Sequence, residues 1–242
     1  MAKSPFDIRV RTEPRISAND LARYMVATDT GKIGIIRRSR ESGAPIRSRY
    51  KDARTAIRSA LCDPVAEKRI LAATKNALEQ RSEDPSQSDF ARDDAEKSFE
   101  ALAAFADIRN QLAGYDYAPA PKSQPKLILN GVEVSVQIDV LIHRSYRGAE
   151  QVGAALFRLT KPEDDETDKA ADKRRDVGQY AATLVHMQLV RNLAGNRVPQ
   201  HTLCWSVDVQ NGEVHAAPRN YLTRATNLEN ACRFIRAMWD TA

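Results

Sequence analysis

The stretch Val132-Glu-Val-Ser-Val-Gln-Ile-Asp-Val-Leu-Ile142 alternates apolar and polar residues almost without interruption. Alternation with a period of two is typical of a β-strand that buries one face. The predicted core face carries six apolar residues: Val132, Val134, Val136, Ile138, Val140 and Ile142. Asp139 lies on the other face, so we expect its carboxylate to point away from the core.

A second apolar run, Gly153-Ala-Ala-Leu-Phe-Arg-Leu-Thr-Lys161, follows and ends in a lysine. Arg147-Gly148 predicts a turn between the two runs. If the two strands are neighbours, Asp139 and Lys161 are expected to meet. An acid on one strand and a lysine ending the next is the plan of many metal-dependent nucleases. The second carboxylate of that plan is expected two residues before the lysine, where this chain has Leu159.

The rest of the chain predicts helices and two hairpins. Tight turns at Asn130-Gly131 and Asn211-Gly212 each join two short apolar segments, as in β-hairpins. Helical spacing predicts helices that begin after a Ser17 cap and over about 49–62, 64–80, 90–112, 172–194 and 227–239. Residues 28–31 are expected to end the first helix, and 32–48 carry no predicted helix. The fold class is therefore α+β, with a helical N-terminal part followed by a mixed β-sheet flanked by helices.

We expect a division into a basic, mainly helical region over residues 1–81 and an α+β domain over 90–242, joined by the polar linker 82–89. Residues 1–60 contain fourteen Lys or Arg and six Asp or Glu, a net charge of +8. The whole chain carries +5, so the remaining residues carry −3. An arginine-rich segment suits contact with phosphate, because the guanidinium group matches phosphate oxygens. The candidate nucleic-acid contacts are Arg37, Arg38, Arg40, Arg47, Arg49 and Lys51.

Several function classes find no support in the sequence. No apolar run approaches the roughly 20 residues that span a membrane, and the N-terminus lacks the apolar core of a signal peptide. The three cysteines are far apart, which argues against a disulfide framework or a zinc site. We expect a cytoplasmic protein without a membrane partner. No glycine-rich phosphate loop is present, and the four histidines show no metal-binding spacing.

The residues around Asp139 and Lys161 resemble the PD-(D/E)xK nuclease superfamily, particularly its RecB-like branch. The resemblance rests on Ile138-Asp139-Val140, on Leu159-Thr160-Lys161 in place of the (D/E)xK triplet, and on Gln179-Tyr180 in the following helix. It covers roughly residues 95–217. The chain departs from the family at Leu159 and at Thr183, where the family pattern has a tyrosine four residues after the glutamine.

The resemblance implies a central mixed sheet flanked by helices, with Asp139, Lys161 and Gln179 in the catalytic set. It also implies that Asp139 binds magnesium, provided that a second carboxylate comes from elsewhere, such as Glu100 or Asp107. The sequence thus favours a protein that binds DNA or RNA on a nuclease-like scaffold with reduced or no catalysis. Two alternatives stay open. One is an active metal-dependent nuclease, and the other is a non-enzymatic interaction subunit of a bacterial multi-protein complex, such as an antiviral defence assembly.

Overall fold

The computed structural model describes residues 9–42, 49–160 and 168–241, and it has the α+β class that the sequence predicts. Its centre is a five-stranded sheet in the order β10-β9-β8-β7-β4. Strands β8 and β9 are parallel, whereas the other neighbours are antiparallel. The five strands are β4 (Asp116–Pro119), β7 (Val140–Tyr146), β8 (Ala149–Arg158), β9 (Val198–Asp208) and β10 (Glu213–Ala216).

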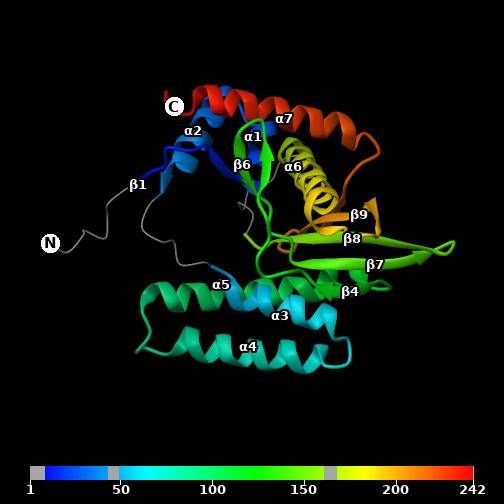
Figure 1. Ribbon diagram of the computed structural model, residues 1–242. Coiled ribbons are helices and arrows are strands. Elements are labelled where there is room, and N and C mark those ends of the chain that lie inside the picture. The colour runs from blue at the N-terminus through cyan, green and yellow to red at the C-terminus, as the bar shows by residue number, and fades with distance from the viewer. Residues whose placement is uncertain (1–8, 43–48, 161–167, 242) are drawn as a thin grey trace.

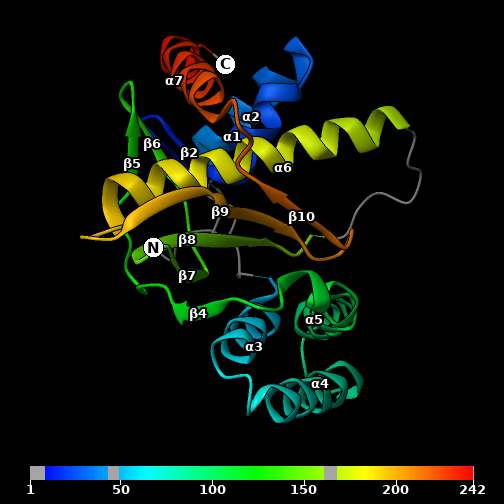
Figure 2. The ribbon, with the colours of Figure 1, turned by 90° about the vertical axis from the view of Figure 1, so that its right-hand side faces the viewer.

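Helices cover both faces of this sheet (Figures 1 and 2). One layer consists of α3 (Lys51–Cys62), α4 (Glu67–Glu83) and α5 (Asp89–Ile108), which a short 3-10 turn (Arg109–Leu112) extends. The other layer contains α6 (Asp168–Gln188), which continues as a π-helical segment (Leu189–Leu193) and joins the parallel strands β8 and β9. Above α6 lie α1 (Ala18–Val26), α2 (Asp29–Arg40) and α7 (Tyr221–Met238).

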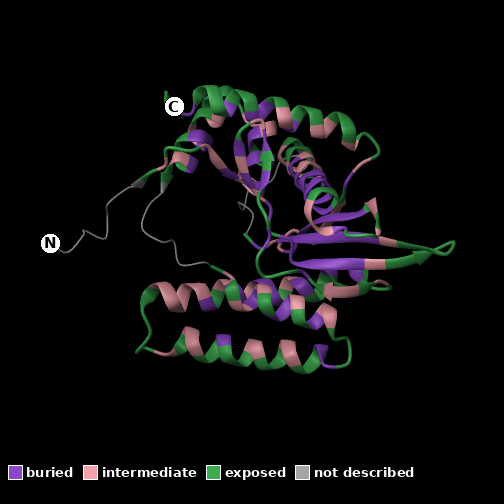
Figure 3. Cartoon of the chain, in the orientation of Figure 1, coloured by how far each residue is buried: buried purple, intermediate pink, exposed green. Residues whose placement is uncertain are grey.

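The central sheet therefore lies between two hydrophobic cores. Leu156 of β8 points into the core on the α6 side, and Phe157 points into the core on the α3–α5 side. Burial extends along the whole middle of β8, where every residue from Val152 to Phe157 is buried (Figure 3). A strand that is covered on both faces typically has a continuous run of apolar residues, as β8 has from Val152 to Phe157.

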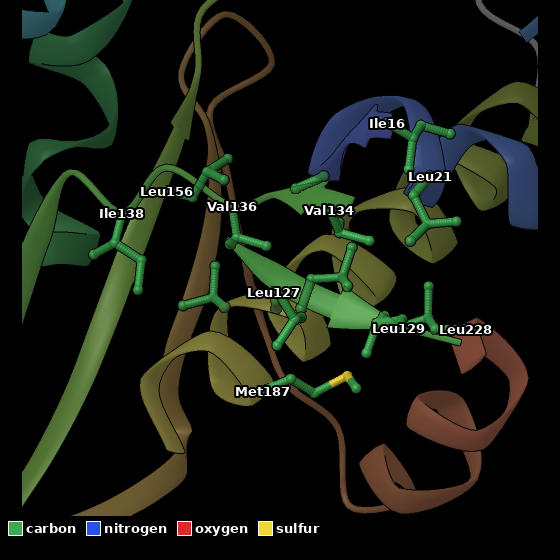
Figure 4. Packing of buried hydrophobic residues seen from close by; sticks show 14 of the residues in the cluster. Ile16, Leu21, Leu127, Leu129, Val134, Val136, Ile138, Leu156, Met187 and Leu228 are labelled. Atoms are coloured by element: carbon green, nitrogen blue, oxygen red, sulfur yellow. The ribbon is translucent and has the colours of Figure 1, made fainter. Parts of the chain in front are cut away.

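The long alternating stretch forms two strands in two different sheets, so the prediction of one continuous strand was wrong. β6 (Val132–Ser135) pairs with β5 (Leu127–Leu129) and with β2 (Arg15–Ser17), whereas β7 belongs to the central sheet. The apolar stripe changes sides between the strands. Val136 and Ile138 pack in the core on the α6 side (Figure 4), whereas Val140 packs on the α3–α5 side.

The break between the two strands is held by the buried side chain of Gln124. Its Nε2 donates to the carbonyl of Ile138 (2.8 Å), and its Oε1 accepts from the Ile138 N–H (3.0 Å). The amide thus replaces a strand neighbour for the backbone of Ile138. A buried N–H or C=O without a partner costs free energy, so this contact allows the chain to pass from one sheet to the other.

Two helix caps near the N-terminus explain one correct and one wrong prediction. Ser17 caps α1 and accepts from the N–H of Asp20 (3.1 Å), as the sequence predicts. Thr28 was expected to help end a helix, but it caps α2 by accepting from the Gly31 N–H (3.3 Å). Helix α2 was therefore missed. Residues Glu41–Ser42 (β3) then pair with Arg9–Val10 (β1) in a separate two-stranded ribbon.

Packing crosses the predicted boundary between residues 1–81 and 90–242. Strand β2 lies parallel to β6, with Ile16 opposite Val134. Leu21 of α1 packs in the same core as Leu228 of α7 (Figure 4). The two predicted regions therefore contribute to the same hydrophobic cores on both sides of the central sheet.

A glycine allows β8 and β9 to approach closely. The register of this pair shifts between Val152 and Ala154, where Gly153 lies. A Cβ atom on Gly153 would lie 2.1 Å from the backbone oxygen of Leu203 and 2.2 Å from its Cβ. Any side chain would therefore push the two strands apart.

Candidate functional site

Asp139 precedes β7 and is almost completely buried, with 1% of its surface exposed. Its Oδ2 accepts from the Phe157 N–H of β8 (2.7 Å) and from the Arg54 guanidinium of α3 (2.6 Å). The same guanidinium donates to the carbonyl of Phe157 (2.9 Å). Arg54 thus bridges the Asp139 carboxylate and the backbone of β8. The expectation that Asp139 points away from the core was wrong, because a second core covers that face of the sheet.

Burial is the largest influence on Asp139 and raises the pKa of its carboxyl. The Arg54 guanidinium, the Phe157 N–H and the nearby Arg58 oppose this rise. Arg58 lies one turn after Arg54 on α3 and donates to the carbonyl of Ala120 (3.5 Å). A buried carboxylate requires a counter-charge, and the arginines of α3 supply it.

The other residues of the predicted catalytic set do not join Asp139 in the part of the chain that the structure describes. Lys161 lies outside the described residues. Gln179 is on α6, across the central sheet, where its Oε1 accepts from Arg224 (2.7 Å). Leu159 is buried with Phe157 in the core on the α3–α5 side.

The described residues near Asp139 do not fit a magnesium site. Magnesium prefers several oxygen ligands, including one or two carboxylates and water. Over residues 9–42, 49–160 and 168–241, no three His, Cys, Asp or Glu side chains come close enough together to hold a metal ion. Of the suggested supplements, Asp107 is exposed on α5 and Glu100 is half-buried. The Asp139 oxygen that faces α3 already accepts from a cationic side chain.

The predicted nucleic-acid contacts are divided between the two helical layers. Arg37, Arg38 and Arg40 lie on α2, whereas Lys51 begins α3 on the opposite side of the central sheet (Figure 1). Arg49 forms an ion pair with Asp93 of α5. Arg47 is outside the described residues. A run of basic residues in the sequence thus does not become one basic surface.

A basic and aromatic cluster that the sequence analysis missed lies at the tip of the β7–β8 hairpin. The hairpin extends beyond the body of the protein (Figure 1). Its turn contains Arg147 (φ 51°) and Gly148 (φ 77°), both in the left-handed region that tight hairpins use. The guanidinium carbons of Arg144 and Arg147 lie 5.6 and 5.2 Å from the ring centre of Tyr146. We call Arg144, Tyr146 and Arg147 the hairpin tip. Its sequence signal was Arg144-Ser-Tyr-Arg-Gly148, from which only the turn was predicted.

Two histidines with no metal-binding spacing in the sequence meet at the start of α7. The Tyr221 ring centre lies 4.6 Å from that of His186 and 4.8 Å from that of His201, on which it stacks. His186 is buried, and this burial is the main reason that its pKa falls to about 4, with a smaller contribution from His201.

We expect this histidine to make folding sensitive to acid. The unfolded chain protonates His186 near pH 6.5, whereas the folded protein resists protonation down to about pH 4. The free energy of unfolding therefore falls as the pH drops through this window, by about 3 kcal/mol at most. Urea titrations of the wild type and of His186→Phe, at several pH values, test this. The difference in the free energy of unfolding between the two proteins should change between pH 7 and pH 4. A constant difference would contradict the role of His186.

No helix in the described part of the chain is both long and apolar enough to cross a bilayer. A scan against models of protein families finds no match for this chain, and a search of curated proteins finds none either.

Proposed function

We propose that this protein binds nucleic acid without cutting it, on a scaffold that resembles the PD-(D/E)xK nucleases. The hairpin tip is the observation that carries the proposal. Tyr146 is 45% exposed, and both neighbouring arginines are exposed as well. A two-stranded ribbon fits the major groove of a duplex, and an exposed aromatic ring stacks on the bases of a single strand. Guanidinium groups beside the ring supply the contacts to phosphate.

The surroundings of Asp139 support the absence of catalysis. A metal-dependent nuclease needs a carboxylate that is free to bind a cation. Here the carboxylate accepts from Arg54 and from the backbone of β8, and it is closed off from solvent. The arginine takes the electrostatic place of a metal, so Asp139 joins α3 to the sheet instead of serving chemistry. The mixed sheet with helices on both faces supports the resemblance to the nuclease scaffold.

We expect binding to depend on the hairpin tip and on salt. Fluorescence anisotropy with a labelled single strand and its matching duplex, over a series of sodium chloride concentrations, gives the slope of log K against log salt. Replacing both Arg144 and Arg147 by alanine should reduce the magnitude of that slope by about 2, because each phosphate contact contributes about 0.9 on a duplex. Tyr146→Ala should weaken binding to the single strand by about 10-fold or more.

The double variant Arg37→Ala/Arg38→Ala is a matched control, because it removes the same charge from the exposed face of α2. We expect its slope to equal that of the wild type. If the salt slope falls in Arg37→Ala/Arg38→Ala and stays at the wild-type value in Arg144→Ala/Arg147→Ala, the binding surface is on α2. The proposal for the hairpin tip is then wrong. If wild-type protein cleaves either probe with magnesium and Lys161→Ala does not, the non-catalytic part of the proposal is wrong.

A further inference from the structure

A groove of about 490 Å³ is lined by residues of α1, α2 and α7. These three helices lie away from the hairpin tip (Figure 1). Most of the lining of the groove is apolar, from Tyr24, Met25, Ile33, Ile36, Phe234 and Met238. Three of these side chains are unusually exposed for large apolar residues, at 41% for Ile33, 67% for Phe234 and 40% for Met238. A contiguous apolar surface with a polar rim marks an interaction site.

The groove has the length of a short helix. On α7 it is lined by residues spaced three or four apart, which form one stripe along the helix: Asn227, Asn230, Ala231, Phe234 and Met238. The ends of this stripe are eleven positions apart, which is a rise of about 16 Å or three helical turns. An amphipathic helix that lies in a groove uses anchors over about the same length. Methionine on both sides suits such a surface, because its side chain adapts to the shape of a partner.

On each side of the groove, an exposed arginine lies within one turn of the lining residues. Arg37 lies one turn after Ile33 on α2, and Arg233 lies one turn after Asn230 on α7. Neither forms an ion pair with any residue in the described ranges, whereas Lys32 in the lining is paired with Asp29 (3.3 Å). A partner that fills the groove therefore gains from acidic residues on both sides of its apolar stripe.

We propose that this groove binds an amphipathic helix of a partner protein, about three turns long, with Asp or Glu flanking its apolar stripe. The apolar lining offers few groups to a nucleotide, and two separated arginines make a weaker phosphate track than the hairpin tip. A concave groove also suits one helix better than the flat surface of a membrane. This interaction is independent of nucleic-acid binding, because the two surfaces are on different elements.

The test is a selection from a displayed library of short amphipathic helices in which the residues flanking the apolar stripe are randomised. The full chain serves as the bait. Enriched peptides should carry an excess of acids at the flanking positions. Phe234→Ala should weaken binding of the best synthetic peptide by about 10-fold or more, as expected at an anchoring contact. Arg37→Glu/Arg233→Glu should weaken the same peptide and strengthen a version with lysine at the flanks.

Leu222→Ala is the matched control, because Leu222 is on the same helix, is also 67% exposed and does not line the groove. Its affinity for the peptide should remain within about twofold of the wild type. The proposal would be overturned if the enriched peptides had no excess of acids at the flanking positions. It would also be overturned if Phe234→Ala and Leu222→Ala lost affinity for the peptide equally. Binding to vesicles rich in phosphatidylserine that Phe234→Ala abolishes would also overturn it, in favour of a membrane surface. Phe234 and Leu222 are both exposed, so we expect the two alanine variants to fold, and circular dichroism checks this.

Discussion

Arg54→Met is expected to lower the free energy of unfolding by about 3–5 kcal/mol. The substitution keeps much of the apolar stem and removes the charge. Among the described residues, the buried Asp139 carboxylate then keeps one hydrogen-bond donor, the Phe157 N–H. Removing one partner of a buried ion pair is costly because the other charge stays away from water. Urea unfolding, followed by circular dichroism, measures the loss.

The pH dependence of that loss identifies its cause. Burial raises the pKa of Asp139, and Arg54 opposes the rise, so the pKa should climb further in Arg54→Met. A group whose pKa is higher in the folded state contributes stability at low pH and loses it as the pH rises. The difference between the wild type and Arg54→Met should therefore shrink as the pH falls from 8 toward 5.

Two further variants make the test specific. The double variant Arg54→Met/Asp139→Asn should recover part of the lost stability, because a neutral amide needs no counter-charge. Arg49→Met breaks the more exposed pair with Asp93 and should cost less than about 1 kcal/mol. If Arg54→Met costs no more than Arg49→Met, the pair with Asp139 does not hold α3 against the sheet.

Gly153→Ala is expected to lower the free energy of unfolding by about 3 kcal/mol or more. The added Cβ meets the backbone of Leu203 on the neighbouring strand, and backbone atoms in the middle of a sheet have little freedom to move. In a domain of this size, that loss lowers Tm by roughly 6–12 °C. Thermal unfolding followed by circular dichroism gives the value.

Gly34→Ala is a control with the opposite sign. Gly34 lies within α2, and the nearest atom to an added Cβ there is the Arg38 guanidinium nitrogen at 3.4 Å, at the end of a flexible side chain. Alanine favours the helix, so Gly34→Ala should stabilise the protein by about 0.5–1 kcal/mol. A Gly153→Ala protein as stable as the wild type would show that β8 and β9 can separate at the register shift without cost.

Local signals predicted most of the elements but not the partners of the strands. The cap at Ser17 and the turns at Asn130-Gly131 and Asn211-Gly212 depend on neighbouring residues, and all three are confirmed. The passage of the chain from one sheet to the other after Ser135 depends on the side chain of Gln124. Apolar residues alternate through this break, so periodicity alone gives no sign of it.

The surroundings of Asp139 could not be read from the strand that carries it. The prediction that its side chain leaves the core assumes a sheet with one buried face. The continuous apolar run from Val152 to Phe157 was the available signal that both faces are covered. Arg54, the ion-pair partner of Asp139, is 85 residues away in sequence. It lies in the arginine-rich segment for which the sequence suggests phosphate contact. The net charge of a segment cannot distinguish an arginine that pairs with a buried carboxylate from one that faces solvent.

The pairing of β2 with β6 also sets an order in which the protein can be completed during synthesis. Arg15 lies opposite Glu133, and the Trp239 indole N–H donates to the carbonyl of Arg11 (3.1 Å). At about 5–20 residues per second, a ribosome delivers residue 133 roughly 6–24 s after residue 15, and residue 239 later still. Helices α3, α4 and α5 contact one another through residues that leave the ribosome within one continuous stretch. The layer that contains β2 therefore closes after these three helices have been synthesised, since it joins Arg15 to Glu133 and Arg11 to Trp239.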